Sequence, residues 1–408
     1  MLRIDDTDAE RSEEKYVEAI KEDLQWLGLD WDKFARQSER MEVYDAAVEK
    51  LKEQGRLYAC YETEQELEIK RKMLLSRGRP PIYDREGLKL TDTKKAEYEK
   101  AGRKPHWRFK LNDGAIEWDD EIRGFTHFLG KNLSDPILIR ENGEYTYMLP
   151  STVDDIDLGV TNVIRGEDHV SNTAIQIEIF DALGGKKPLF AHNALIKTKE
   201  GKLSKRKNSD NMKDLRQEGI EPMAINSFLA KVGTSDPIEI RDNLEKLIAE
   251  FDIKKFGRAP TIYSLDDIRR LNEKLLHHLP FDQIKSHLAN VGVNDIDEEF
   301  WLTVRPNVST LGEAKQWHDI CNGQLKPLIE DKNFAQEAAN LLPEGKWNAE
   351  TWNKWVEDVK NKTGRKGKDL FMPLRKALTG LDHGPELKEL LPLIGREKAI
   401  ARLSGKEA

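Results

Sequence analysis

The stretch VTNVIRGEDHVSNTAIQIEIFDALGG, residues 160–185, carries the clearest local pattern of the chain. Its β-branched start predicts a strand over about 160–165, and the apolar run that follows predicts a helix over about 171–183. The pair Gly184-Gly185 is a typical helix stop. Because strands that alternate with helices usually form a parallel sheet, this stretch indicates an α/β fold.

The start of the chain shows the same alternation. Residues 2–4 predict a strand, and apolar residues at helical spacing predict a helix over about 9–27. Thr7 and Glu10 have the spacing of a capping box for this helix. A second helix is predicted over about 42–54.

The rest of the chain divides into two regions of different character. Residues 145–149 predict a strand, followed by an acidic turn at 154–157. Residues 59–144 combine one charged helix, a proline-rich break and short strand patterns, which indicates an inserted α+β unit. From residue 211 onward the pattern is almost entirely helical, which predicts an all-α region.

The composition is that of a folded protein. With 66 Lys and Arg against 74 Asp and Glu, the net charge of −8 argues against indiscriminate coating of nucleic acid. No apolar run approaches the ~18 residues of a membrane span, and the charged start differs from a signal peptide, so we expect a cytoplasmic location. The cysteines Cys60 and Cys321 lie far apart, so neither a disulfide framework nor a cysteine zinc site is expected.

A lysine-rich segment is the strongest chemical signal. Six cations lie within eleven residues around a glycine and a serine: Lys197, Lys199, Lys202, Lys205, Arg206 and Lys207. Ammonium groups on flexible stems can follow the negative charge that builds on a leaving pyrophosphate. The alternative is a solvated basic turn, as most charge runs are. No P-loop or G-x-G-x-x-G fingerprint is present.

These segments together resemble the bacterial glutamyl-tRNA synthetases, which are class I aminoacyl-tRNA synthetases. Four segments in matching order carry the resemblance: LRIDDTDAERS (2–12), YML with VDD (147–149, 153–155), VIRGEDH (163–169) and KLSKR (202–206). A fifth, FMPLR (371–375), is similar to part of the family's anticodon-binding half. Together they span nearly the whole chain.

The resemblance implies a Rossmann-like parallel sheet, incomplete at its N-terminus, and an order of domains. The expected order is a first catalytic part (1–58), an inserted acceptor-end-binding domain (59–144), a second catalytic part (145–192), the KMSKS loop with a stem-contact region (193–258) and a helical anticodon-binding region (259–408).

The resemblance also implies the reaction. Glutamate attacks the α-phosphate of ATP, which enters with Mg²⁺, and the glutamyl group then passes from the adenylate to the terminal ribose of tRNA(Glu). In this analogy Lys202 and Lys205 hold the ATP phosphates, Ser204 shapes their loop, and Arg206 and His169 lie near the nucleotide. On the residues alone, His169 beside an aspartate is more often structural than catalytic.

Three residues are implied to hold glutamate. Arg165 would pair with the side-chain carboxylate through its planar guanidinium, and Tyr147 and Asp5 would line the same pocket. Asp5 would face the α-amino group, although the family more often has Glu there. Each has a plainer interpretation: Asp5 as a helix cap, Arg165 as a structural ion pair and Tyr147 as a core residue.

A tRNA partner requires basic surface. The predicted backbone contacts are Lys360, Lys362, Arg365, Lys366, Lys368 and Arg375. The segment Trp107-Arg108-Phe109 is either a contact to the acceptor end or a buried strand, and we favour the strand. Some relatives hold zinc in the inserted unit, but only Cys60 is nearby here, so no zinc is expected. The protein is expected to act as a monomer.

One departure from the family concerns the start of the catalytic domain. Class I enzymes carry a His-x-Gly-His signature, the HIGH motif, and none of the nine histidines here belongs to one. Either the natural protein is longer, or the chain is an inactive tRNA-binding paralogue. The chain alone is therefore expected to be weakly active or inactive. A glutaminyl enzyme or a short tRNA-modifying relative agrees less well with the helical C-terminal half, and charging of tRNA(Gln) stays open.

Overall fold

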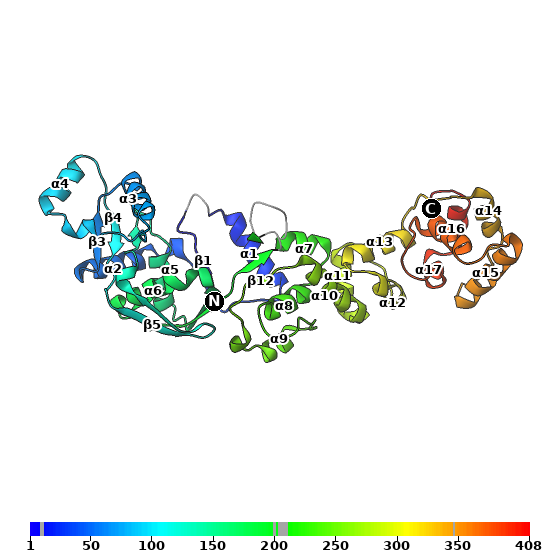
Figure 1. Cartoon of the computed structure of the whole chain (residues 1–408). Helices are drawn as coiled ribbons and strands as arrows, with labels where there is room; N and C mark the ends of the chain where they lie inside the picture. Colours follow the sequence, from blue (N-terminus) through cyan, green and yellow to red (C-terminus); the bar gives the residue numbers. More distant parts are fainter. Residues whose placement is uncertain (9–11, 199–200, 203–210, 346) are drawn as a thin grey trace. The chain divides into compact units, whose positions relative to one another are not determined.

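The computed structural model describes residues 1–8, 12–198, 201–202, 211–345 and 347–408. The chain divides into two compact units, which are described separately below (Figure 1). The first unit consists of Met1–Leu203, Lys231–Pro237 and Phe251–Tyr263, and the second of Ser204–Ala230, Ile238–Glu250 and Ser264–Ala408.

The first unit opens with a strand–helix–strand element. Strand β1 (Leu2–Ile4) pairs in parallel with β2 (Phe34–Arg36), and helix α1 (Glu14–Trp26) connects them. The helix begins at Glu14 with Glu13 as its N-cap residue, so Thr7 does not cap it, and Glu10 of the predicted capping box lies outside the described residues. Helix α2 (Met41–Glu53) agrees with the prediction and follows the short turn η1 (Gln37–Glu39).

The predicted inserted region contains an antiparallel sheet in the order β3-β4-β7. Its strands and helices are β3 (Leu57–Cys60), α3 (Glu64–Ser76), η2 (Glu86–Lys89), α4 (Asp92–Lys100), β4 (His106–Phe109) and β7 (Ile137–Ile139). Helix α3 begins with a capping box between Thr63 and Glu66. Phe109 is fully buried and Arg108 nearly so, which confirms the interpretation of Trp107-Arg108-Phe109 as a buried strand.

A four-stranded sheet in the order β6-β5-β9-β8 forms the centre of the first unit. Its strands are β5 (Ala115–Asp120), β6 (Gly124–Leu129), β8 (Asn162–Gly166) and β9 (Leu189–Asn193), joined by η3 (Gly130–Asn132) and η4 (Glu167–His169). Strands β8 and β9 are parallel, as the alternation predicted, and β5 is parallel to β9, whereas β6 is antiparallel to β5, so the sheet is mixed. Strands β5 and β6 lie within the predicted inserted region 59–144 but belong to this sheet. Helix α6 (Val170–Leu183) packs on β5 and ends at Gly184, whose φ of +71° favours glycine.

The predicted strand at 145–149 and acidic turn at 154–157 are wrong. Helix α5 (Met148–Asp157) occupies this region, and Tyr145 alone forms an isolated bridge, with Ile139. The acidic residues are stable inside the helix because they have partners. The buried Asp154 accepts hydrogen bonds from Tyr44 and from two further side chains, and it is not in a solvated turn.

A small sheet in the order β11-β10-β12 follows the central sheet. It consists of β10 (Ile196–Thr198), β11 (Gly201–Lys202) and β12 (Thr261–Ile262), the last preceded by η5 (Ile253–Lys255). Strands β10 and β11 are antiparallel. They are the part of the lysine-rich segment that the structure describes.

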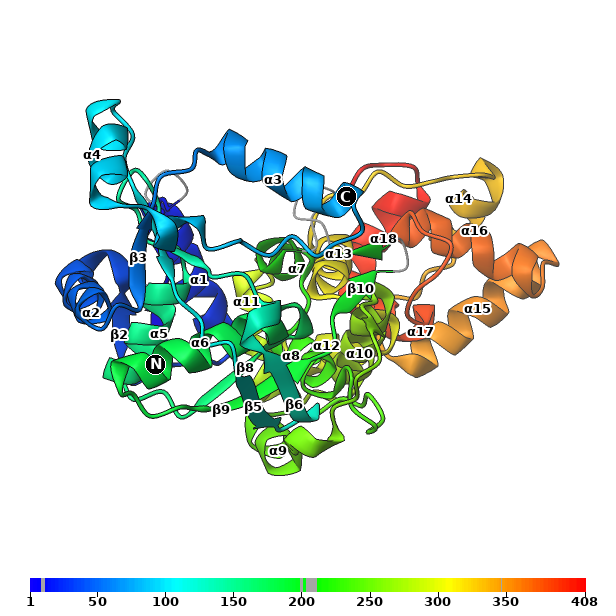
Figure 2. The same ribbon diagram turned by 60° about the vertical axis from the view of Figure 1, so that its left-hand side comes forward.

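The second unit is helical, as predicted. Its elements are α7 (Met212–Glu218), α8 (Pro222–Lys231, whose last residue belongs to the first unit), α9 (Leu244–Glu250), α10 (Leu265–His278), α11 (Phe281–Asn290), α12 (Glu298–Val304), η6 (Arg305–Asn307), α13 (Leu311–Asn322), α14 (Lys332–Asn340), α15 (Ala349–Thr363), α16 (Lys368–Thr379), α17 (Leu387–Ile394) and α18 (Arg396–Leu403). Helices α14 to α18, orange to red in Figure 2, pack on one another around Trp355 and Leu374. Among the described residues, no helix is long and apolar enough to cross a membrane.

Candidate active site

Three parallel strands bring polar side chains to one edge of the central sheet. Arg165 lies near the carboxyl end of β8 and is paired in register with His192 of β9. Asp120 is the last residue of β5, the next strand along. Ligands of open α/β sheets bind outside the carboxyl ends of such strands, so this edge is the candidate site.

The guanidinium of Arg165 is held by neutral groups. Its Nη2 donates to Thr173 Oγ1 at 2.5 Å and to Gln176 Oε1 at 2.6 Å. Among the described residues, no carboxylate lies within ion-pairing distance of it. Burial lowers the pKa of Arg165, against the favourable charges of Tyr147 and Asp155. A cation held only by neutral partners is available to an anionic ligand.

Tyr147 lies in the field of this cation and is in contact with His169. Tyr147 is the N-cap residue of α5, not part of a strand. Its hydroxyl accepts a hydrogen bond from Asn172 at 2.5 Å, and its ring meets that of His169 edge to face, with centroids 6.0 Å apart. Burial raises the pKa of Tyr147, and the charge of Arg165 opposes that rise. The hydroxyl therefore stays protonated and can donate to a ligand.

Asp5 is connected to the same group through Arg3. Arg3 Nε donates to Asp5 Oδ1 and its Nη1 to Asp155 Oδ1, both at 2.8 Å. Burial raises the pKa of Asp155, and the charges of Arg3 and Arg165 both oppose that rise. Asp155 thus lies in the field of both arginines. The Asp5 carboxylate is half exposed, so it can still receive a cationic group.

The lysine-rich segment begins on the same side of the sheet. Strand β10 starts three residues after β9 ends, and β11 places the backbone of Lys202 opposite Lys197. The predicted residues Ser204, Lys205 and Arg206 lie outside the described residues.

The sequence pattern did not predict the residues that contact Arg165 or the residues that support those contacts. Thr173, Gln176, His192 and Asp120 are all buried. Asp120 and His192 are 72 positions apart in the sequence, and no spacing rule connects them. The one indication in the sequence is that Asp120 and His192 are polar residues at or near the ends of strands.

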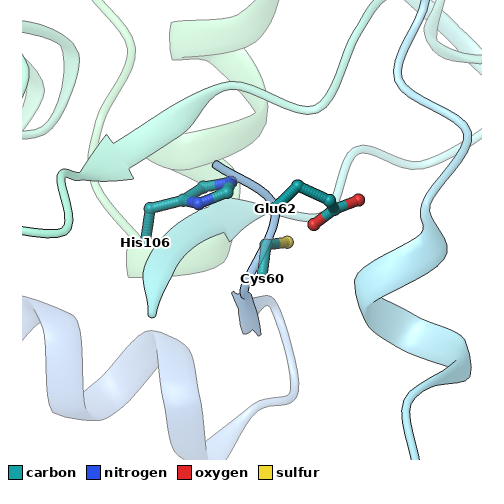
Figure 3. A group of neighbouring side chains, drawn as sticks. All are labelled: Cys60, Glu62 and His106. Carbon is teal, nitrogen blue, oxygen red and sulfur yellow. The ribbon is translucent and has the colours of Figure 1, made fainter. Parts of the chain in front are cut away.

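A cluster with metal-binding residue types lies in the inserted region. The ligand atoms of Cys60, Glu62 and His106 lie within 4.8 Å of one another (Figure 3). Tyr83 Oη donates to Glu62 Oε1 at 2.9 Å and contacts Cys60 Sγ at 3.4 Å, and Arg108 Nε donates to His106 at 3.3 Å, whereas the buried Glu62 Oε2 has no hydrogen-bond partner among the described residues. Structural zinc sites use four ligands, and this cluster has three donors beside a cation.

The pKa values of this cluster are shifted by burial. Burial raises the pKa of Cys60 to about 11 and lowers that of His106 to about 4. A thiol with such a pKa does not supply the thiolate that zinc binds, unless the metal itself drives deprotonation. The residues therefore fit zinc poorly, and the absence of zinc stays a prediction.

The predicted basic track lies around the connection between α15 and α16. Four of its six residues are exposed: Lys360, Lys362, Lys366 and Lys368. Arg365 instead pairs with Asp331 at 2.5 Å and covers the ring of Phe334. Arg375 donates to the backbone oxygens of His383 and Pro385, and burial lowers its pKa. These two arginines therefore already have partners within the protein.

Comparison with known proteins covers nearly the whole chain. The family model for the class I tRNA synthetases (E and Q), catalytic domain, matches residues 1–263, and that for the anticodon binding domain matches 306–405. The chain is 50% identical over 410 residues to glutamate–tRNA ligase 1 of Maricaulis maris and 52% identical over 410 residues to glutamate–tRNA ligase of Azospirillum brasilense. In both comparisons the match covers 100% of this chain and 92% of the relative.

A solved structure shows the same fold. The crystal structure of a glutamate–tRNA ligase from Elizabethkingia meningosepticum in complex with its amino acid matches with a TM-score of 0.80 and 25% identity. The match covers 98% of this chain and 91% of that chain.

Proposed function

The chain belongs to the glutamate–tRNA ligases, which are class I aminoacyl-tRNA synthetases, and from this premise we propose that Arg165 selects glutamate by binding its side-chain carboxylate. The observation that carries the proposal is a half-buried guanidinium whose hydrogen-bond partners among the described residues are Thr173, Gln176 and, at 3.5 Å, His192, none of them a carboxylate. A planar guanidinium can bind a carboxylate through two parallel hydrogen bonds. Glutamine offers no charge to such a group, so the same residue discriminates between the two amino acids.

The neighbouring side chains complete the proposed glutamate site. Tyr147 donates a hydrogen bond from its hydroxyl to the bound amino acid. Asp5, which pairs with Arg3 and is half exposed, faces the α-amino group. With both ends of the substrate fixed, the α-carboxylate is free to attack the α-phosphate of ATP. Such fixation converts a bimolecular encounter into a positioned reaction.

We propose that the lysine-rich segment serves the phosphates. Lys202 and Lys205 neutralise the charge that develops on the departing pyrophosphate, while Ser204 shapes the loop. Arg206 and His169 lie near the nucleotide, and Mg²⁺ accompanies ATP. The start of β10 directly after β9 supports this role, because it connects the segment to the edge that carries Arg165.

The helical unit is proposed to bind tRNA(Glu). Exposed lysines at 360, 362, 366 and 368 contact the phosphate backbone, and Arg365 and Arg375 contribute at its margin. We propose the domain order given above: residues 1–58 and 145–192 catalytic, 59–144 for the acceptor end, 193–258 for the loop and stem, and 259–408 for the anticodon. A monomer acting in the cytoplasm suits these roles, and assays with both tRNAs decide whether tRNA(Gln) is also charged.

Substitution of Arg165 tests the proposed glutamate site. In the Arg165→Gln variant, kcat/KM for glutamate in aminoacylation should fall about 100-fold or more, because a charge-assisted bidentate contact is lost. The KM for ATP should change little. The exposed Arg140→Gln variant is the matched control and should behave as wild type. Unchanged selection of glutamate over glutamine by Arg165→Gln would remove this arginine from the site.

A further inference from the structure

A buried chain of hydrogen bonds runs from Asp120 to the candidate glutamate receptor. Asp120 Oδ2 lies 2.5 Å from His192 Nδ1, and His192 Nε2 lies 2.8 Å from Thr173 Oγ1. Thr173 Oγ1 in turn accepts a hydrogen bond from Arg165 Nη2 at 2.5 Å. Thr173 and His192 are fully buried and Asp120 is 3% exposed, so water does not supply alternative partners.

The Asp120 end of this chain fixes the direction of its first bond. Burial would raise the pKa of Asp120, but the hydrogen bonds from the His192 side chain and from three backbone N–H groups lower it to about 2. The carboxylate therefore accepts only. Its neighbour Nδ1 must then carry the hydrogen and donate.

The remaining two bonds follow from this tautomer. A histidine that carries a single hydrogen, on Nδ1, presents Nε2 as an acceptor. The Thr173 hydroxyl can donate to Nε2 while its oxygen accepts from Arg165. Every donor thus meets an acceptor. The opposite tautomer would turn an N–H of His192 toward the hydroxyl and the guanidinium, with no hydrogen left for the Asp120 carboxylate.

We propose that Asp120, His192 and Thr173 are positioning residues that fix the guanidinium of Arg165 in the orientation for binding the side-chain carboxylate of glutamate. This inference rests on the proposed role of Arg165. The relay brings a negative charge close enough to orient the guanidinium, which contacts Thr173 and, at 3.5 Å, His192, while the Asp120 carboxylate itself makes no hydrogen bond or ion pair with it. A carboxylate in direct contact would instead occupy the face of Arg165 that glutamate needs.

The arrangement differs from a purely structural network in one measurable respect. A structural role predicts that loss of the Thr173 hydroxyl lowers stability alone. A positioning role predicts that the same loss weakens glutamate binding specifically, while ATP binding is unaffected, because only the amino acid meets Arg165.

Two Thr173 variants separate these outcomes. Thr173→Val removes the hydroxyl at nearly constant volume and should raise the dissociation constant for L-glutamate, measured by calorimetric titration, about ten- to a hundredfold. Thr173→Ser keeps the hydroxyl and should stay within about threefold of wild type. Asp120→Asn should weaken glutamate binding about tenfold, because the amide no longer requires the donor tautomer.

Thr379→Val is the matched control. Thr379 is 1% exposed in α16 and donates to a backbone oxygen one turn earlier, so its loss carries a comparable stability cost, and it belongs to the second unit, whereas the glutamate site belongs to the first. This variant should bind L-glutamate as wild type does. Thermal unfolding of all variants shows which of them remain folded at the titration temperature.

The outcomes separate failure of the relay from failure of the proposed role of Arg165. If Arg165→Gln loses L-glutamate binding while Thr173→Val and Asp120→Asn retain wild-type affinity, the relay is refuted and the proposed function stands. If Arg165→Gln itself binds L-glutamate normally, the proposed function fails. If Thr173→Val and Thr173→Ser are equally weakened, the lost methyl packing and not the hydroxyl is responsible, and the relay is again refuted.

Discussion

Arg3 and Asp155 form an ion pair of 2.8 Å between strand β1 and helix α5, although 152 positions separate them in the sequence. Their side chains are 17% and 10% exposed, so the pair is largely shielded from water. Because Arg3 also pairs with Asp5, and Asp155 lies in the field of Arg165, the ion pair connects Asp5 with the residues around Arg165. A contact of such long range and low exposure is both a stability element and part of the site.

Removal of this pair should be costly. In Arg3→Ala, the buried Asp155 carboxyl group loses its cation, and the free energy of unfolding should fall by about 3 kcal/mol. Urea denaturation measures this change. Lys94→Ala, which breaks the exposed pair with Glu97, is the control and should leave the free energy of unfolding nearly unchanged. Equal effects in the two variants would contradict a buried role for Arg3.

Gly130 occupies a position that excludes any side chain. A Cβ there would lie 1.8 Å from the backbone oxygen of Asn112, and Gly130 N donates to Gly114 O at 2.8 Å. Gly130→Ala must displace backbone and should cost about 3 kcal/mol. Gly114→Ala, with no heavy atom within 4 Å of its Cβ, should cost little. The pair of melting temperatures checks the prediction, and a Gly130→Ala protein as stable as Gly114→Ala would contradict it.

The pair of His287 and Glu221 should make stability depend on pH. The 2.6 Å hydrogen bond that His287 Nδ1 donates to Glu221 Oε2 raises the pKa of His287 above its ordinary 6.5, against the effect of burial. A raised folded-state pKa means that the contribution is fully present below about pH 6.5 and is lost as the pH rises through the folded-state pKa.

Comparison with His287→Gln isolates this contribution. The difference in free energy of unfolding between wild type and variant should be larger at about pH 6 than at about pH 8.5. Urea titrations at the two pH values provide the measurement. A difference that is constant or grows with pH would show that His287 is not stabilised as the cation.

The cluster of Cys60, Glu62 and His106 makes the absence of zinc testable. Because Tyr83 and Arg108 already engage these groups, the purified chain should contain well under one zinc ion per molecule by elemental analysis. Treatment with EDTA should leave its melting temperature unchanged. One tightly held zinc per chain, lost together with stability in the Cys60→Ser variant, would contradict this expectation.

Local pattern was enough to predict elements whose residues agree with their surroundings. The helix from Val170 to Leu183 and the strand before it were placed nearly correctly, because both are apolar runs with a clear stop at Gly184. The resemblance then directed attention to Arg165 and Tyr147, which do lie together.

Other features depend on contacts that sequence spacing does not encode. The acidic residues around Asp154 look like a turn, and only the partners Arg40 and Tyr44, more than 100 positions away, make them helical. The hydrogen bond between Asp120 and His192 likewise depends on the pairing of strands β5 and β9, which sequence spacing does not encode. Long-range pairing of polar groups, not local propensity, accounts for what was missed.

The basic track between α15 and α16 should control how strongly tRNA binding depends on salt. Lys360, Lys362, Lys366 and Lys368 are exposed, so they can exchange counterions for RNA phosphates. Replacing the four lysines by alanine should weaken tRNA(Glu) binding. The slope of log K against log salt should become shallower by about 0.7 to 0.9 for each lysine that contacts a phosphate.

Filter binding or fluorescence titration at several salt concentrations measures this slope. Arg365→Ala is the informative comparison: because Arg365 pairs with Asp331 and covers Phe334, its loss should lower stability more than it changes the slope. The fold of the four-lysine variant should be intact, since none of the four side chains is buried. An unchanged slope in that variant would place the RNA-binding surface elsewhere, because affinity carried by phosphate neutralisation cannot lose four contacts without losing its salt dependence.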